Sequence, residues 1–148
     1  MIGIINKRGI SDAKLEHIFL GTVNSGKVSG YHCDKSFGDE KVYAETKLYP
    51  KSSRTITANK QQKVFEAVVR EKGTHRLKNS NGGKSTFFNK DWSRQEVVDC
   101  IARLKTSGSL IKKYRMTKSV NCNQVYVDRA TGVVVVSNKA TTYPLLKY

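Results

Sequence analysis

The chain of 148 residues has few cysteines, and their spacing matches neither a metal site nor a redox pair. Cys33, Cys100 and Cys122 are odd in number and lack the Cys-x-x-Cys spacing of zinc sites and dithiols. Three unpaired thiols favour work in a reducing compartment. Cys33 directly follows His32, which leaves a cysteine nucleophile as an alternative, although neighbours in sequence need not meet in space.

Long apolar runs are absent as well. No stretch approaches the roughly 20 apolar residues that cross a bilayer, so the sequence predicts no membrane span. The N-terminal residues lack the extended apolar segment of a secretory signal, and export would depend on signals outside this chain. A composition of 38% hydrophobic and 26% charged residues is typical of one folded domain, and the length also fits two small lobes sharing a cleft.

Acidic residues are scarce, with 12 Asp and Glu against 27 Lys and Arg, a net charge of +15 and a pI near 9.9. Three long stretches contain no acidic residue: those between Glu45 and Glu66, between Glu71 and Asp91, and between Asp99 and Asp128. One basic stretch is typical of a solvated surface, whereas three together favour a polyanionic partner. An anionic membrane would attract the same charge, but no long basic amphipathic helix presents it.

Short elements are predicted in the first half of the chain. Ser11 is a typical N-cap for a short helix over residues 12–16, with His17 at its end. Residues 21–30 are rich in glycine and small polar side chains and predict turns. Residues 63–69 fit a strand or a helix, and their β-branched valines favour the strand.

The second half gives clearer signals. Ser93 and Glu96 have the spacing of a capping box, followed by an apolar stripe, which predicts a helix from about Ser93 to Lys105 that ends near Gly108. Strands are predicted over 124–127, 133–136 and 140–143, with a turn over 128–132 and an exposed loop over 74–84. Helices first and strands afterwards predict an α+β protein. Phe87, Phe88 and Trp92 are expected in the core, with base stacking as the alternative.

Two of the three histidines, His17 and His32, lie fifteen positions apart on either side of the glycine-rich segment. Imidazole titrates near neutrality, so a pair of histidines can supply both a base and an acid to one reaction. In a basic protein this pattern favours chemistry on RNA, whose 2′-hydroxyl is a built-in nucleophile. A lone histidine is more often a structural residue, and spacing alone does not decide between the two. His75 has no motif around it and is left outside the predicted site.

Three short motifs in order resemble the EndoU family of endoribonucleases. They are His-Ile-Phe leading through glycines to Gly-Tyr-His, then Lys-Ser-Thr-Phe-Phe-Asn, then Thr-Thr-Tyr-Pro, and they extend from His17 to Leu145. The match is particularly similar to the bacterial branch of the family, the C-terminal toxin domains of contact-dependent inhibition (CdiA-CT) and related systems. Asn89 stands where that branch commonly has a proline after the two phenylalanines.

The resemblance implies specific roles for individual residues. It places the catalytic pair at His32, as general base, and His17, as general acid. The active-site lysine is expected at Lys84, with Lys60 and Lys72 as alternatives. The expected substrate-binding residues are Gly30, through its backbone N–H, and Thr141 and Tyr143.

The resemblance also implies a fold and a function. We expect one domain over residues 1–148 with the EndoU-like fold of the RNase A-like (BECR) type: short N-terminal helices and two small antiparallel sheets that form a cleft, with the lobe boundary within about residues 70–90. The expected activity is metal-independent and cofactor-free cleavage of RNA, with tRNA as the expected substrate, to 2′,3′-cyclic phosphate and 5′-hydroxyl ends. As a toxin domain, delivered from the producer as part of a larger protein, it would act in the cytoplasm of a target bacterium. An acidic immunity protein would be its second partner.

Two other classes of protein fit the same composition. A non-catalytic RNA-binding module would use the basic stretches and aromatic residues to hold RNA intact. A basic structural protein of a larger assembly would carry the histidines incidentally. Cleavage of RNA by the purified chain distinguishes an enzyme from both.

Overall fold

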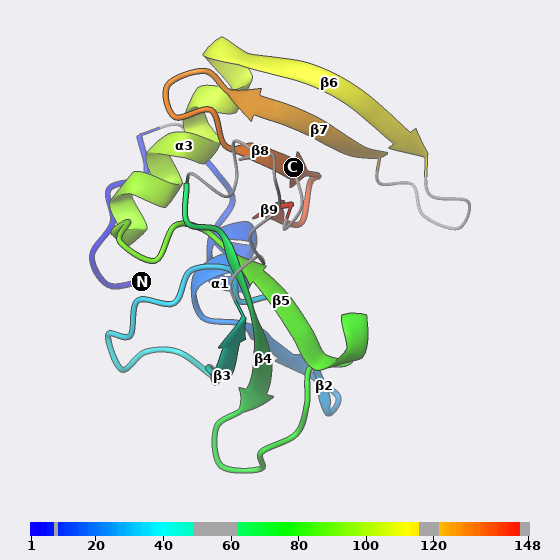
Figure 1. Cartoon of the computed structure of the whole chain (residues 1–148). Coiled ribbons are helices and arrows are strands. Elements are labelled where there is room, and N and C mark those ends of the chain that lie inside the picture. Colours follow the sequence, from blue (N-terminus) through cyan, green and yellow to red (C-terminus); the bar gives the residue numbers. More distant parts are fainter. Residues whose placement is uncertain (8, 49–61, 116–121, 146–148) are drawn as a thin grey trace.

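A computed structural model describes residues 1–7, 9–48, 62–115 and 122–145. The chain is α+β, as predicted, with helices packed beside separate antiparallel sheets (Figure 1). The described residues form a two-stranded hairpin, a three-stranded sheet and a four-stranded sheet. Within these residues no helix is both long and apolar enough to span a membrane.

The first helix, α1, covers Asp12–Phe19 and confirms the predicted capped helix. The Ser11 hydroxyl accepts a hydrogen bond from the Lys14 backbone N–H at 3.2 Å, which satisfies a donor in the first turn. Leu15, Ile18 and Phe19 are buried, so the helix is anchored to the core along one side.

The glycine-rich segment after α1 forms a hairpin rather than turns alone. Strands β1 (Thr22–Asn24) and β2 (Lys27–Ser29) pair antiparallel around Ser25 and Gly26, both of which have positive φ. The turn was predicted, but the strands were not. Three residues per strand are too few to establish an alternating pattern that sequence analysis can read.

The three-stranded sheet has the order β3 (Val42–Leu48), β4 (Phe65–Glu71) and β5 (Lys84–Phe87). The strand prediction for residues 63–69 is confirmed by β4, whose buried and half-buried residues alternate. A short 3₁₀ turn, η1 (Asn81–Gly83), leads into β5. Val28 of the hairpin packs with Phe65, Val69 and Phe87 in a core on this side of the molecule.

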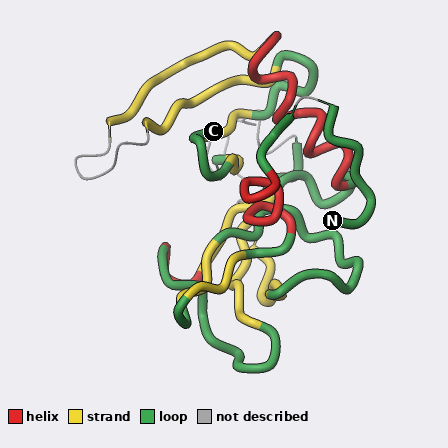
Figure 2. Tube along the Cα trace, turned by 180° about the vertical axis from the view of Figure 1, so that it is seen from behind, coloured by secondary structure: helices red, strands yellow, loops and turns green. Residues whose placement is uncertain are grey.

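The four-stranded sheet contains β6 (Gly108–Arg115), β7 (Cys122–Asp128), β8 (Val134–Ser137) and β9 (Thr142–Pro144) in chain order. The predicted meander is confirmed by the last three strands, and β6 adds an edge that was not predicted. In Figure 2 the long β6–β7 ribbon extends away from the rest of the molecule.

Helix α3 (Arg94–Ser107) packs against the four-stranded sheet. Its predicted capping box is present: the Glu96 backbone N–H donates to the Ser93 hydroxyl at 3.1 Å, and the Ser93 backbone N–H donates to the Glu96 carboxylate at 3.1 Å. The largest core cluster joins α1, α3 and β8, and the predicted core residues Phe88 and Trp92 belong to it.

The chain passes from one core to the other between two adjacent residues, Phe87 and Phe88. Strand β5 of the three-stranded sheet also contacts β9 of the four-stranded sheet. The histidine-bearing segment at residues 30–32 is held between α1 and β5, because the His32 N–H donates to the Ile18 carbonyl (2.7 Å) and the Phe88 N–H donates to the His32 carbonyl (2.9 Å). This junction positions the candidate site.

Candidate functional site

A pocket of about 410 Å³ lies where α1, the hairpin, β5 and β9 meet. Both predicted catalytic histidines and all three predicted substrate-binding residues line it. Its walls are formed by His17, Ser29, Gly30, His32, Lys78, Ser80, Asn81, Ser85, Thr86, Thr141 and Tyr143. We call it the histidine pocket. Segments from residue 17 to residue 143 therefore contribute to one concave surface.

His32 is held with one ring nitrogen fixed. It is 4% exposed, and its Nδ1 lies 2.8 Å from the Thr86 carbonyl oxygen. A carbonyl only accepts hydrogen bonds, so Nδ1 carries the proton and Nε2 keeps a free lone pair. The Tyr143 ring stacks on the imidazole, with centroids 5.3 Å apart and planes 25° apart. His32 is thus oriented as a proton acceptor.

Burial also keeps His32 neutral. Removal from water, together with the Lys78 and His17 charges, lowers the pKa of His32 to about 3, and the Thr86 hydrogen bond opposes this only in part. A neutral imidazole is a base and cannot serve as an acid. The neutral state of His32 and its tautomer therefore indicate the same role, that of a proton acceptor.

His17 lies in the last turn of α1, half-buried, with its ring centroid 6.2 Å from that of His32. Its Nδ1 is 3.2 Å from the Thr22 hydroxyl of β1. Burial, and then the Lys78 charge, lower the pKa of His17 below its ordinary value. Two imidazoles at this separation can face opposite oxygens of one phosphodiester.

Gly30 is required where β2 approaches α1. Its φ is +79°, and a Cβ at this position would lie 2.2 Å from the His17 carbonyl oxygen and 3.0 Å from its Nδ1. The next backbone N–H, that of Tyr31, donates to the same His17 carbonyl at 2.8 Å. The absence of a side chain at Gly30 thus lets the two histidine-bearing segments meet.

The lysine in the pocket is Lys78. Its Nζ donates to the Ser85 hydroxyl at 2.6 Å, and that hydroxyl donates to the Gly30 carbonyl at 2.8 Å. Ser85 is buried, and burial lowers the pKa of Lys78 to about 8. The hydrogen bond to Ser85 fixes the ammonium group of Lys78 in the pocket that also contains both histidines. Sequence analysis missed Lys78, which was one basic residue of a polar loop with no periodic pattern.

Lys84 does not line the histidine pocket. Side chains alternate across a strand, so Ser85 points inward from β5 and its neighbour Lys84 points away, 40% exposed, with Nζ 3.7 Å from the Glu66 carboxylate. Of the two alternatives, Lys72 has its Nζ 3.5 Å from the buried Glu40 carboxylate, also outside the pocket. Lys60 falls outside the described residues.

Thr141, directly before β9, and Tyr143, within β9, form another wall of the histidine pocket. The Thr141 hydroxyl oxygen is buried and has no hydrogen-bond partner among the described residues. Such a group is costly to leave unpaired in a folded protein, so it is suited to a ligand that fills the pocket. Tyr143 presents its ring to His32 and borders the same space.

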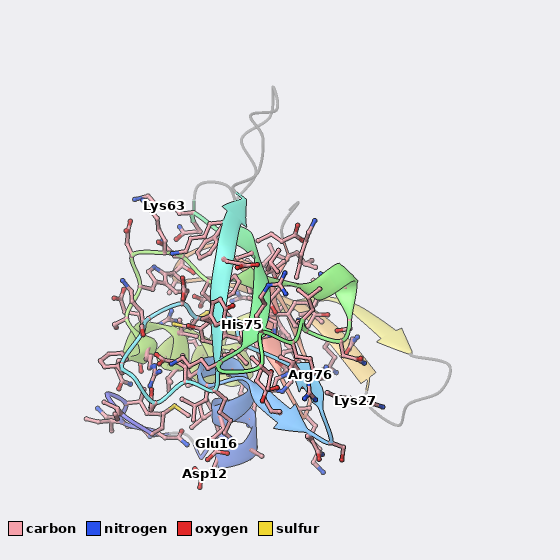
Figure 3. All side chains as sticks on the ribbon, turned by 90° about the horizontal axis from the view of Figure 1, so that it is seen from below. Asp12, Glu16, Lys27, Lys63, His75 and Arg76 are labelled. Carbon is pink, nitrogen blue, oxygen red and sulfur yellow. The ribbon has the colours of Figure 1, made fainter. Side chains whose placement is uncertain are left out.

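The remaining sequence candidates lie elsewhere. Burial raises the pKa of the Cys33 thiol to about 12, so this cysteine is not a thiolate nucleophile at neutral pH. His75 lies on the surface turn after β4, where its Nδ1 is 2.8 Å from the Tyr43 hydroxyl (Figure 3). The described side chains include no group of three or more His, Cys, Asp or Glu residues placed to hold a metal ion.

Comparison with known proteins shows similarity to a protein family and to a bacterial relative. The family model of the bacterial EndoU nuclease matches residues 11–146. A Bacillus cereus protein named "Toxin" is 36% identical over 88 residues, which are 59% of this chain and 14% of the relative's length. The chain thus spans about a seventh of that relative. No solved structure matches significantly. Since the family match covers almost the whole chain and includes every segment that lines the histidine pocket, the chain belongs to the bacterial EndoU nuclease family.

Proposed function

We propose that this nuclease cleaves RNA by attack of a ribose 2′-hydroxyl on the adjacent phosphate. The observation that carries the proposal is the convergence of His17, His32 and Lys78 in the histidine pocket. A proton acceptor, a second imidazole and a fixed cation are the groups that this reaction needs. DNA lacks the attacking hydroxyl and is not a substrate.

In the proposed reaction, Nε2 of His32 takes the proton of the 2′-hydroxyl as its oxygen bonds to phosphorus. The bond between phosphorus and the 5′-oxygen breaks, and His17 donates a proton to that oxygen. The products are a 2′,3′-cyclic phosphate and a 5′-hydroxyl. The fixed tautomer of His32, with its Nε2 unprotonated, supports its role as base, so His17 takes the role of acid.

We assign the phosphate-facing charge to Lys78 rather than to Lys84. Lys78 lines the pocket, held by Ser85, while Lys84 points away toward Glu66. The Gly30 backbone N–H would face the phosphate, the Thr141 hydroxyl would bind the base, and Tyr143 would pack near the ribose. The buried, unpaired Thr141 oxygen supports the assignment of a polar ligand to this wall.

The biological role we propose is that of a toxin domain in bacterial competition, of the kind found in contact-dependent inhibition. The similarity to a Bacillus cereus protein named "Toxin" supports the role of a toxin. The match covers only 14% of that relative, which supports delivery as one part of a longer protein. The target would be tRNA in the cytoplasm of another bacterium. A net charge of +15 suits an acidic immunity protein as the producer's protection.

The test is incubation of the purified chain with end-labelled tRNA and with a DNA of the same sequence, in the presence of a chelator. We expect RNA cleavage alone, with cyclic phosphate and 5′-hydroxyl ends. His17→Ala and His32→Ala should each reduce cleavage about 10²-fold or more while RNA is still bound. Intact RNA with the unaltered chain would leave only a binding module, and loss of cutting with chelator would contradict metal independence.

The two lysines form a matched pair within the same experiment. Lys78→Met should lower kcat about 10²-fold, because it removes a fixed charge from the phosphate. Lys84→Met removes a half-exposed charge from the same part of the fold and should change kcat less than threefold. The opposite ranking would return the catalytic role to Lys84.

A further inference from the structure

A second cavity, of about 600 Å³, is larger than the histidine pocket. It lies between α1, the end of α3 and the four-stranded sheet, and its size is that of a small-ligand site. The residues used below are Lys14, Lys105, Lys139, Gln124, Tyr126 and Ser137, all of which line it. We call it the lysine cavity.

The charge of the lysine cavity is uncompensated. None of the ion pairs between described residues involves Lys14, Lys105 or Lys139. On α1 the acidic Asp12 and Glu16 are exposed at the edge of the molecule in Figure 3, and neither lines the cavity. Three ammonium groups around one concave space favour an anionic ligand.

Lys14 is the most deeply placed of the three. Its Nζ donates to the Ser137 hydroxyl (3.3 Å) and to the Asn138 carbonyl (3.0 Å), which leaves one of its three N–H groups without a partner among the described residues. Burial and the Lys105 charge lower the pKa of Lys14 to about 8. A bound anion would offset both effects and would meet the remaining N–H.

The neutral lining of the cavity suits a nucleoside. Tyr126 is half-buried, and its hydroxyl donates to the Gln124 side-chain oxygen at 2.6 Å. That bond fixes the orientation of the Gln124 amide and leaves its NH₂ group as a donor. An aromatic ring, an oriented amide and three cations are together the groups that bind a nucleotide.

The two cavities have no lining residue in common, but residues close to one another in α1 and at β9 line each of them. Lys14 and His17 stand three residues apart on α1, on the same side of the helix. Lys14 bonds to Ser137, whose hydroxyl lies 2.7 Å from that of Thr142, between the two pocket residues Thr141 and Tyr143. We infer from these contacts that an RNA strand bound in the histidine pocket could extend past α1 and β9 to the lysine cavity.

We propose that the lysine cavity binds a nucleotide of the RNA strand outside the cleaved step. Lys14, Lys105 and Lys139 contact its phosphate, and Tyr126 with Gln124 faces the nucleoside. The proposal rests on the proposed function, because it takes RNA as the polymer in the histidine pocket. It makes cleavage depend on the length of the RNA as well as on the step that is cut.

The test compares a ribodinucleotide with an RNA of about ten nucleotides that contains the same cleaved step. Lys105→Glu with Lys139→Glu reverses two exposed charges of the cavity. We expect kcat/KM on the longer RNA to fall about tenfold or more, and at least five times as much as on the dinucleotide. The matched control is Lys41→Glu with Lys90→Glu, two exposed lysines that line neither cavity, which should alter both substrates about equally.

A binding measurement separates this proposal from the cleavage chemistry. In a His32→Ala background, the cavity variant should weaken binding of the longer RNA and lower the slope of log Kd against log salt concentration by about one to two. Thermal unfolding confirms that each variant is folded. Equal losses on both RNAs, or unchanged binding of the longer one, would overturn the proposal. A chain that cuts neither RNA refutes the proposed function, while the binding comparison still decides the cavity.

Discussion

At the scale of single residues, protonation states set the conditions under which the site works. The pKa of His32 is about 3 and that of His17 lies below its ordinary value, chiefly because both rings are buried beside Lys78. The proposed mechanism needs His32 neutral and His17 protonated. His32 is neutral at every pH well above 3, so the protonation of His17 limits the rate as pH rises.

We therefore predict that kcat/KM on a dinucleotide is maximal at a pH below 6.5. Above the pKa of His17 it should fall about tenfold per pH unit, because the free enzyme loses its acid. Above about pH 8 the fall should steepen as Lys78 loses its charge. Initial rates from pH 4 to 9 measure the profile. A plateau that extends beyond pH 7.5 would contradict the assignment of His17 as the acid.

Sequence analysis singled out residues of the histidine pocket where they belong to short motifs, and it did not single out the pocket lysine in the loop. His17, Gly30, His32, Thr141 and Tyr143 were singled out, and all of them line one pocket. Lys78 was not, because a basic chain offers many lysines and loop conformation has no periodic signal. The neighbouring motif pointed to Lys84, one residue before Ser85, and strand alternation turns that side chain away from the pocket.

At the scale of elements, local signals predicted some parts of the fold and not others. The α3 capping box and the buried alternation of β4 are encoded by adjacent residues, and both were predicted. The β1–β2 hairpin and β6 were not. Their pairing depends on partners placed by the rest of the fold, and pairing of this kind leaves little trace in the strand itself.

The close approach of β2 to α1 gives a prediction at this scale. Gly30→Ala should reduce kcat/KM at least 10²-fold and also destabilise the fold, because the new methyl group would overlap the His17 carbonyl and displace the ring. The control is Gly132→Ala, which has the same positive φ of about +80° but no atom within 4 Å of the added Cβ.

Gly132→Ala should cost roughly 1 kcal/mol of backbone strain and leave kcat/KM unchanged. Urea unfolding and dinucleotide kinetics measure both variants. If Gly30→Ala kept full activity, the tight contact between the histidine-bearing segments would not be what positions His17.

At the scale of the whole molecule, one buried arginine joins distant segments. Arg94 at the start of α3 is fully buried and pairs with Asp39 and Glu40, at 2.8 and 3.2 Å, and its Nη1 donates to the Ile2 carbonyl at 3.1 Å. Its guanidinium also lies 4.6 Å from the centre of the Phe37 ring. The N-terminal segment and the loop before β3 are thereby fixed to α3.

We predict that Arg94→Met lowers the free energy of unfolding by roughly 3–5 kcal/mol, because it removes the buried cation that pairs with Asp39 and Glu40 and leaves Glu40 only its longer contact with Lys72. Arg70→Met is the matched control. The Arg70–Glu45 pair is short, at 2.6 Å, but much more accessible to solvent than Arg94, and its loss should cost clearly less than the loss of Arg94. Urea denaturation measures both, and equal costs would show that the burial of Arg94 adds nothing to its pairing.

The residues that line the histidine pocket are spread along the sequence, from residue 17 to residue 143. Its first wall is built by residue 17 and its last by residue 143, on the short terminal strand β9. A growing, clipped or partly unfolded chain that lacks this strand has no second wall against which to hold a substrate. The histidine pocket therefore cannot form before β9 has been synthesised and has paired with β8.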